Sequence, residues 1–131
     1  MENGEELLYR AVELKNKSED VEKNLQFIGE QIAELEDFNK SVERLEKENE
    51  KEILANIGRG VFVKADRKIG EKLFVDIGGG ILVRKTPKAT RKIIEEQIIK
   101  FNEAKIKLTE ELEYFAAQFR QMMEEVEKLK K

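Results

Sequence analysis

The chain has 131 residues, of which 40% are Asp, Glu, Lys or Arg, and it carries a net charge of −3 at pH 7. So many charges leave few side chains for a large compact core, whereas long helices bury only a narrow apolar stripe. The acidic balance gives no electrostatic reason to bind nucleic acid. Because there is no Cys and no His, disulfides, thiolate nucleophiles, histidine bases and the usual zinc sites are excluded.

The first residues, Met-Glu-Asn-Gly-Glu-Glu, lack the basic and apolar regions of a signal peptide. No apolar run approaches the roughly 20 residues that a membrane span requires. The absence of cysteine fits a reducing compartment. We therefore expect a cytoplasmic protein with no membrane contact.

Residues 1–52 are predicted to form a long N-terminal helix, because 5–52 contain no Pro and a single Gly. Apolar residues recur there at alternating intervals of four and three, the period of a coiled-coil seam, which also passes through polar Ser18 and Asn39. Gly29, beside this seam, costs about 1 kcal/mol relative to Ala. The apolar seam positions are Leu7, Ala11, Leu14, Val21, Leu25, Ile28, Ile32, Leu35 and Val42.

Residues 53–86 change to short runs rich in Ile, Val and Phe, separated by glycines. Alternation of side chains predicts four strands, and the Gly-Arg-Gly and Gly-Gly-Gly joints are short enough for tight turns. The segment therefore predicts two consecutive β-hairpins. The predicted strands are 53–57, 60–66, 72–77 and 81–85.

Residues 87–131 are predicted to form a second helix, with Thr86 as N-cap and Pro87 at the first helical position. Its seam has eleven positions, of which only Lys105 is not apolar. Since the two helices match in length and a compact insert joins them, we expect an antiparallel coiled coil with two β-hairpins at its base, an α+β fold. The second seam is Ile94, Ile98, Phe101, Lys105, Leu108, Leu112, Phe115, Phe119, Met122, Val126 and Leu129.

No pattern in the chain predicts catalysis. The Gly78–Gly80 run is not followed by Gly-Lys-Ser/Thr, and a strand follows it where a phosphate loop needs a helix. Many carboxylates have a Lys four residues later, as in Glu43 and Lys47, which is typical of a solvated helix face. We expect no enzyme activity, no metal and no cofactor.

The order helix, two hairpins, helix resembles the alpha class of prefoldin subunits, and the likeness covers essentially the whole chain. The most specific part is the stretch from Ile53 to Thr86. There, Val75-Asp76-Ile77-Gly78-Gly79-Gly80 is similar to the turn that precedes the last strand of that family. Two departures are Ala55-Asn56 in the first strand and Ile81-Leu82 after the glycines, where other residues are common.

The resemblance implies an ATP-independent holdase. Two alpha-class and four beta-class subunits would join their hairpins into a body, and the coiled-coil tips would hold unfolded proteins and pass them to a group II chaperonin. The sequence leaves open an alternative, a homo-oligomer or filament of this chain assembled through the same hairpins. An adaptor that recognises one folded partner is a further alternative.

The physical pattern points to two kinds of site residue. Isolated hairpins are marginally stable and their edges invite pairing, so one hairpin face is predicted to be the oligomerisation surface. At the helix ends opposite the hairpins, apolar side chains are predicted to bind clients. For those on the seam, zipping the end of the coil is the alternative explanation, whereas Leu8, Val12 and Met123 lie just off the seam and cannot all be buried between two helices. The first set is Ile57, Val61, Val63, Val75, Ile77 and Val83, and the second is Leu7, Leu8, Ala11, Val12, Met122, Met123, Val126 and Leu129.

Overall fold

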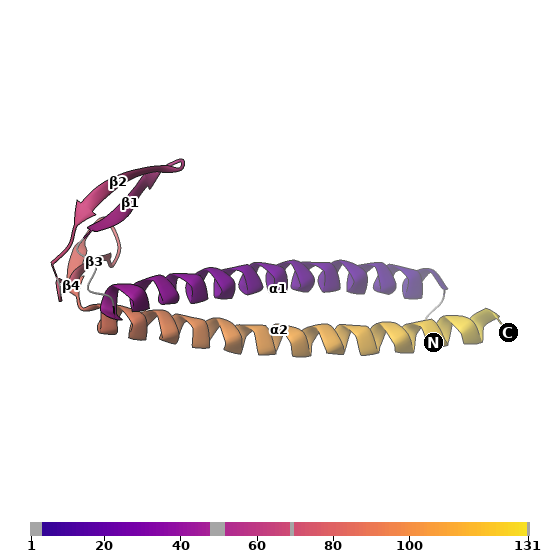
Figure 1. Cartoon of the computed structure of the whole chain (residues 1–131). Coiled ribbons are helices and arrows are strands. Elements are labelled where there is room, and N and C mark those ends of the chain that lie inside the picture. The colour runs from indigo at the N-terminus through magenta and orange to yellow at the C-terminus, as the bar shows by residue number, and fades with distance from the viewer. Residues whose placement is uncertain (1–3, 48–51, 69, 131) are drawn as a thin grey trace. The chain divides into compact units, whose positions relative to one another are not determined.

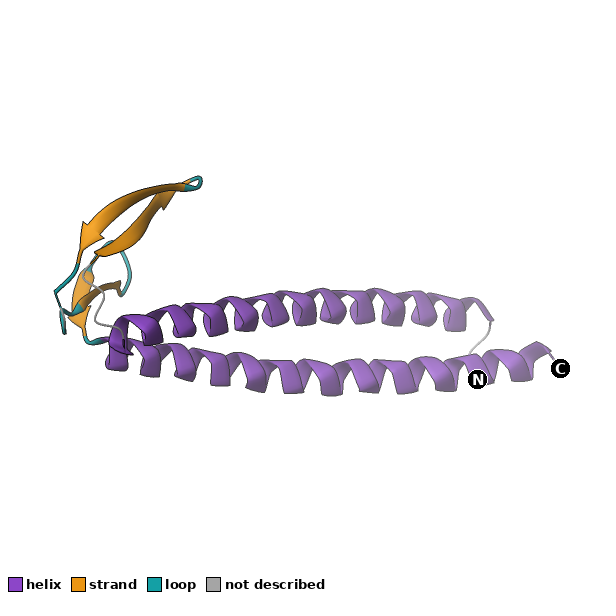
Figure 2. Ribbon diagram, viewed as in Figure 1, coloured by secondary structure: helices purple, strands orange, loops and turns teal. Residues whose placement is uncertain are grey.

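The computed structural model of the chain describes residues 4–47, 52–68 and 70–130. In this part, two long helices lie side by side, and two antiparallel strand pairs come between them in the chain (Figures 1 and 2). The predicted order of helix, two hairpins and helix is confirmed. The elements are α1 (Gly4–Lys47), β1 (Glu52–Gly58), β2 (Val61–Asp66), β3 (Leu73–Asp76), β4 (Leu82–Lys85) and α2 (Pro87–Lys130).

Helix α1 has the charge distribution that complements a helix dipole, with Glu5 and Glu6 in the first turn and Arg44 and Lys47 in the last. The predicted helix reached residue 52, which is too far. Glu52 instead pairs with Asp66 and begins strand β1, because ladder hydrogen bonds satisfy its backbone. Residues 48–51 of that prediction lie outside the described residues. Nothing in the structure explains Gly29, which has open space around it.

The predicted seam of α1 is confirmed along its whole length. All eleven positions, including the polar Ser18 and Asn39, are buried or half-buried, while most positions around them are exposed. The alternating interval therefore describes the face that α1 turns inward. Leu7 and Val42 are among the most completely buried side chains of the described residues.

Helix α2 begins as predicted, because the Thr86 hydroxyl accepts a hydrogen bond from the Ala89 amide at 3.1 Å. Most of its predicted seam is buried or half-buried, but Lys105, Phe119 and Leu129 are exposed. Ala104 and Gln118 are half-buried in place of Lys105 and Phe119. An α-helix has about 3.6 residues per turn and not 3.5, so a strict heptad follows its buried face only approximately.

Two compact units divide the chain: the coil unit, Met1–Ala33 with Ile99–Lys131, and the hairpin unit, Glu34–Ile98. In each unit, a stretch of α1 lies antiparallel to a stretch of α2 (Figure 1). The coil unit has a small core of Ala11, Leu14 and Met122, with Phe115 packed against it. The hairpin unit contains all four strands.

The strands form two separate two-stranded sheets, β1 with β2 and β3 with β4. In the first, Ala55 lies opposite Val63, and the register shifts between Asn56 and Gly58. In the second, Val75 lies opposite Val83. Each predicted strand is confirmed to within one residue at either end.

Candidate interaction surfaces

Three of the predicted client-binding residues on the coil seam are buried within the coil unit. Leu7 is 1% exposed and Met122 is 4% exposed, and Ala11 is also buried. Ala11 and Met122 belong to the same small core, so they hold the two helices together. For these three residues, the structure favours a role in holding the helices together, since a client could reach them only if the helices separated.

The off-seam residues of the same prediction are open to solvent. Leu8 is 66% exposed, and Val12 and Met123 are also exposed. The two remaining seam residues of the prediction differ from Leu7, Ala11 and Met122, because Val126 is half-buried and Leu129 is exposed. We call Leu8, Val12 and Met123 the coil flank. Tyr9, next to Leu8 in the sequence, is 75% exposed and was not among the predicted residues.

The predicted oligomerisation residues lie on the hairpins with two levels of burial. Val75 and Val83, which face each other across β3 and β4, are half-buried. The other four are exposed to solvent within the chain, as an apolar surface awaiting a partner would be. These four are Ile57, Val61, Val63 and Ile77.

The opposite face of each hairpin also carries large apolar side chains, which the sequence prediction did not include. Each of them is more than half exposed, and all but Phe62 lie next to a half-buried residue on the same strand. The prediction missed this face because it assumed that a strand has one apolar side, whereas these strands are apolar on both. The side chains are Leu54 and Phe62 on the first hairpin, and Phe74 and Leu82 on the second.

The two hairpins are copies of one structural unit, 20 residues apart. Residues 54–64 read Leu-Ala-Asn-Ile-Gly-Arg-Gly-Val-Phe-Val-Lys, and residues 74–84 read Phe-Val-Asp-Ile-Gly-Gly-Gly-Ile-Leu-Val-Arg. An internal comparison of the sequence would have found this repeat. It extends to the side chains, because Asn56 and Asp76 each accept a hydrogen bond at 2.8 Å from the amide two residues later.

The turns of the two hairpins also have matching backbones. Gly58 and Gly78 have φ of 127° and 125°, and Arg59 and Gly79, in the next position, have φ of 49° and 62°. The first values suit only glycine, whereas the left-handed region at the next position is strained for Arg59. The same turn is therefore built twice, once with a non-glycine residue.

A cation on the α2 seam lies between acidic groups of both helices in the hairpin unit. Arg91 Nη1 lies 3.0 Å from Glu46 Oε2, and Nη2 lies 3.8 Å from both Glu43 and Glu95. The hydrogen bond to Glu46 raises the pKa of Arg91, and the hydrogen bond from Lys47 lowers the pKa of Glu43. Sequence reasoning missed Arg91 because the seam search began at Ile94 and sought apolar residues.

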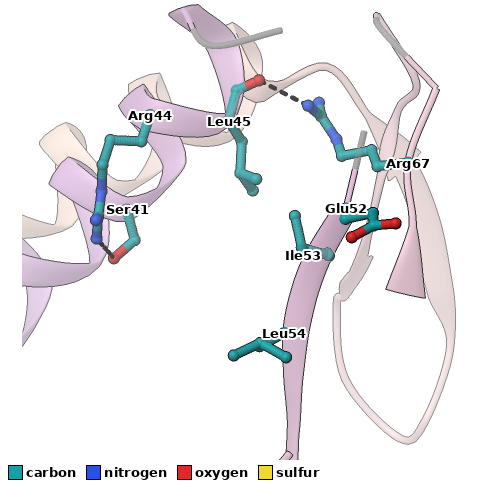
Figure 3. A pocket seen from close by; sticks show the side chains of 7 residues that line it. All are labelled: Ser41, Arg44, Leu45, Glu52, Ile53, Leu54 and Arg67. Atoms are coloured by element: carbon teal, nitrogen blue, oxygen red, sulfur yellow. Dashed lines mark hydrogen bonds between the residues drawn. The ribbon is translucent and has the colours of Figure 1, made fainter. Parts of the chain in front are cut away.

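A second arginine ties the end of α1 to the loop between the hairpins. Arg67 is buried and donates a 2.7 Å hydrogen bond to the carbonyl oxygen of Leu45, and another at 3.3 Å to that of Glu71. Figure 3 shows the first of these bonds beside a hollow of about 490 Å³ that Leu45, Ile53 and Leu54 also line. An orphan carbonyl near a helix C-terminus is thereby satisfied.

The described residues contain no group of three or more acidic, His or Cys side chains that could hold a metal ion. In the same part of the chain, neither helix is apolar enough over its length to cross a membrane.

Comparisons with known proteins place these features in a family. The family model described as "Prefoldin subunit" matches residues 14–131. Two curated relatives are named prefoldin subunit alpha. The relative from Archaeoglobus fulgidus is 30% identical over 94 residues, which are 69% of this chain and 69% of that protein. The relative from Methanobrevibacter smithii is 26% identical over 83 residues, which are 63% of this chain and 57% of that protein.

A solved structure shares the fold. The chain superimposes on filamentous PFD from Methanocaldococcus jannaschii, determined by cryo-EM, with a TM-score of 0.73. The match covers 92% of this chain and 98% of that one, at 18% sequence identity. The prediction of a prefoldin-like α+β coiled coil with hairpins is therefore confirmed.

Proposed function

Because the chain belongs to the prefoldin family, we propose that it is an alpha-class subunit of a cytoplasmic holdase that works without ATP. It assembles through its hairpins with beta-class subunits, in the ratio of two to four, and its coiled coil holds unfolded proteins. A group II chaperonin receives them. No catalytic step and no cofactor enter this function.

The observation that carries the proposal is the coil flank. Leu8, Val12 and Met123 are exposed apolar side chains on a coil whose seam is already filled by Leu7, Ala11 and Met122. Removing the flank from water therefore requires something other than the coil's own partner helix. A flexible thioether such as that of Met123 repacks against varied apolar surfaces, which suits a binder of many sequences.

Weak individual contacts are consistent with holding. Apolar burial contributes roughly 25 cal/mol per Å², so a contact of a few hundred Å² gives several kcal/mol before the ordering of both partners is subtracted. One coil then binds an unfolded chain weakly. Several coils on one oligomer bind it together through their high effective concentration.

An aggregation assay tests the function directly. Chemically unfolded citrate synthase is diluted into buffer containing the chain, with or without an archaeal beta-class prefoldin subunit, and light scattering is followed. We expect suppression to be strongest with both subunits. A variant that lacks residues 1–12 and 122–131 should assemble like the parent and lose suppression. Undiminished suppression by that variant would exclude the coil ends as the client site.

Assembly of copies of this chain into a filament is a second candidate. The specific observation in its favour is that the M. jannaschii protein of the same fold is filamentous. Because this chain carries two equivalent hairpins, each copy has two matched surfaces for neighbours, as an open-ended assembly requires. Electron microscopy of the chain alone, and then with the beta-class subunit, separates open growth from a closed hexamer.

A further inference from the structure

The exposed face of the second hairpin has a regular arrangement of four side chains, which we call the open face: Phe74, Asp76, Leu82 and Arg84. Phe74 lies directly opposite Arg84, and Asp76 lies directly opposite Leu82. All four are exposed, whereas Leu73, Val75, Val83 and Lys85 on the other face are half-buried.

The four positions form a small square whose diagonals differ in chemistry. One diagonal joins Phe74 to Leu82 and is apolar, while the other joins Asp76 to Arg84 and carries opposite charges. Neighbours directly across two strands are about 5 Å apart, and diagonal neighbours are about 7–8 Å apart. The guanidinium of Arg84 lies 5.5 Å from the centre of the Phe74 ring, so the face has defined side-chain positions.

This pattern is complementary to itself. If a second copy is placed face to face by a two-fold axis along the apolar diagonal, Phe74 meets Phe74 and Leu82 meets Leu82. The same rotation exchanges the other two corners, so each Arg84 meets the partner's Asp76. One contact then joins two apolar pairs and two reciprocal ion pairs, which is the symmetry of an isologous interface.

We propose that the open face of β3 and β4 docks on the open face of a second copy of this chain. The proposal rests on the proposed function in one respect, that the hairpins are the assembly elements. It adds which face joins two copies, how they are oriented, and which charges orient them. In an oligomer with two alpha-class subunits, this is a contact between those two subunits.

The first hairpin supplies an internal comparison. Its corresponding positions are Leu54, Asn56, Phe62 and Lys64, so the apolar diagonal is repeated but Asn56 replaces the acid. The same rotation would place Lys64 against the partner's Asn56, with no ion pair. Charge therefore favours self-docking by the second hairpin, and it leaves the first hairpin's Leu54–Phe62 diagonal to a differently charged neighbour.

The size of the face limits its strength. Four side chains from each copy bury a few hundred Å² together, well below the roughly 1,200 Å² of a typical stable interface. The contact consequently acts together with other surfaces of the assembled body. Charged groups at such a contact chiefly fix orientation and exclude wrong pairings, which makes charge exchange the appropriate test.

The experiment uses the full chain and two opposite substitutions, Arg84→Asp and Asp76→Arg. Copies of either variant alone would bring like charges together at both corners. In an equimolar mixture, the new carboxylate of one variant meets the new guanidinium of the other, and native Asp76 meets native Arg84. By sedimentation velocity, we expect each variant to self-associate about tenfold more weakly than the parent, and the mixture to recover most of the loss.

Controls separate the contact from local folding. Asp76→Asn keeps an acceptor for the Gly78 amide, which Asp76 binds at 2.8 Å, while removing the charge. Lys88→Asp changes an exposed cation outside the hairpins and should leave association unchanged. Helical circular dichroism confirms folding, and Arg84→Glu with Asp76→Lys repeats the exchange if either first variant is unstable.

The proposal is overturned if the parent stays monomeric, if either reversed variant associates as strongly as the parent, or if the mixture recovers nothing. The aggregation assay keeps this outcome distinct from the proposed function. A parent that suppresses aggregation while the mixture fails to recover would disprove this contact alone. A parent that never suppresses aggregation would disprove the holdase function, whatever the mixture shows.

Discussion

The coil unit and the hairpin unit both expose apolar side chains, but they do so in different ways. On the hairpins, Leu, Phe and Val alternate at fixed positions of a ladder, and the open face of the second hairpin adds an acid, Asp76, and a base, Arg84. On the coil flank, the exposed apolar side chains of Leu8, Val12 and Met123 come from two helices. Fixed spacing with charge favours one partner, whereas adaptable apolar surface favours many.

The largest effect is expected from the hairpins. Replacing Val75 and Ile77 by Asp places two carboxylates on the predicted oligomerisation face, where assembly would bury them unpaired. A buried unpaired charge costs several kcal/mol, so assembly should weaken by about a hundredfold or more. Size-exclusion chromatography measures the loss, and circular dichroism should show intact helices. Full assembly of this variant would mean that the face is wrongly assigned.

Substitutions in the coil flank should weaken client holding and leave the stability of the fold unchanged. Replacing Leu8, Val12 and Met123 by Gln should weaken client holding about five- to tenfold, because apolar contact with the client is lost. The melting temperature should change by less than about 2 °C, since exposed substitutions rarely matter for folding.

The same unit offers a matched control for the flank. Ile99 and Ile106 are exposed and lie one heptad apart on α2. Replacing both by Gln removes a similar apolar area, so holding should be preserved if the flank is specific. An equal loss in the two variants would move the client site to the side of the coil.

Breaking the ion pairs of Arg91 should have a smaller effect, which is confined to the stability of the fold. Arg91→Ala removes contacts to Glu43, Glu46 and Glu95, and we expect a melting temperature lower by a few degrees at low salt. Because salt screens exposed ion pairs, the difference from the parent should shrink as salt rises. A difference that persists in 1 M salt would show that the Arg91 stem acts by packing.

The smallest effect concerns the register of α2. The sequence placed Lys105 on the seam, where a change to Leu would raise stability, but the structure exposes Lys105 and half-buries Ala104. We now expect Lys105→Leu to leave the melting temperature nearly unchanged and Ala104→Lys to lower it. Thermal unfolding of the two variants decides between the registers, since the strict heptad predicts that Lys105→Leu raises the melting temperature and that Ala104→Lys leaves it nearly unchanged.

Much of the fold could be read from the sequence because local rules govern it. The α1 seam was found at every position, since apolar spacing directly reports which face of a helix is buried. The N-cap at Thr86 and both hairpin turns followed from residue types with strong backbone preferences. The end of α1 was placed too late because Glu, Lys and Asn continue past Lys47 with no Gly or Pro to stop a helix.

The candidate surfaces were only partly predictable. Sequence named Leu7 and Leu8 together, and only packing showed that one is buried in the seam while the other is open. It likewise chose one hairpin face, because alternation says that two residues share a side without saying which side the chain itself covers.

The sequence by itself determined the class of the molecule: two heptad helices around two glycine-turned hairpins, without the residues for metal or thiol chemistry. The tertiary structure decided what is left exposed. It half-buried Ala104 where the heptad predicted Lys105, and it placed Arg91 among three carboxylates from both helices. It also set Asp76 and Arg84 on one diagonal of an open face. Periodicity fixes the face of a single element, whereas exposure and charge pairing depend on which elements meet in space.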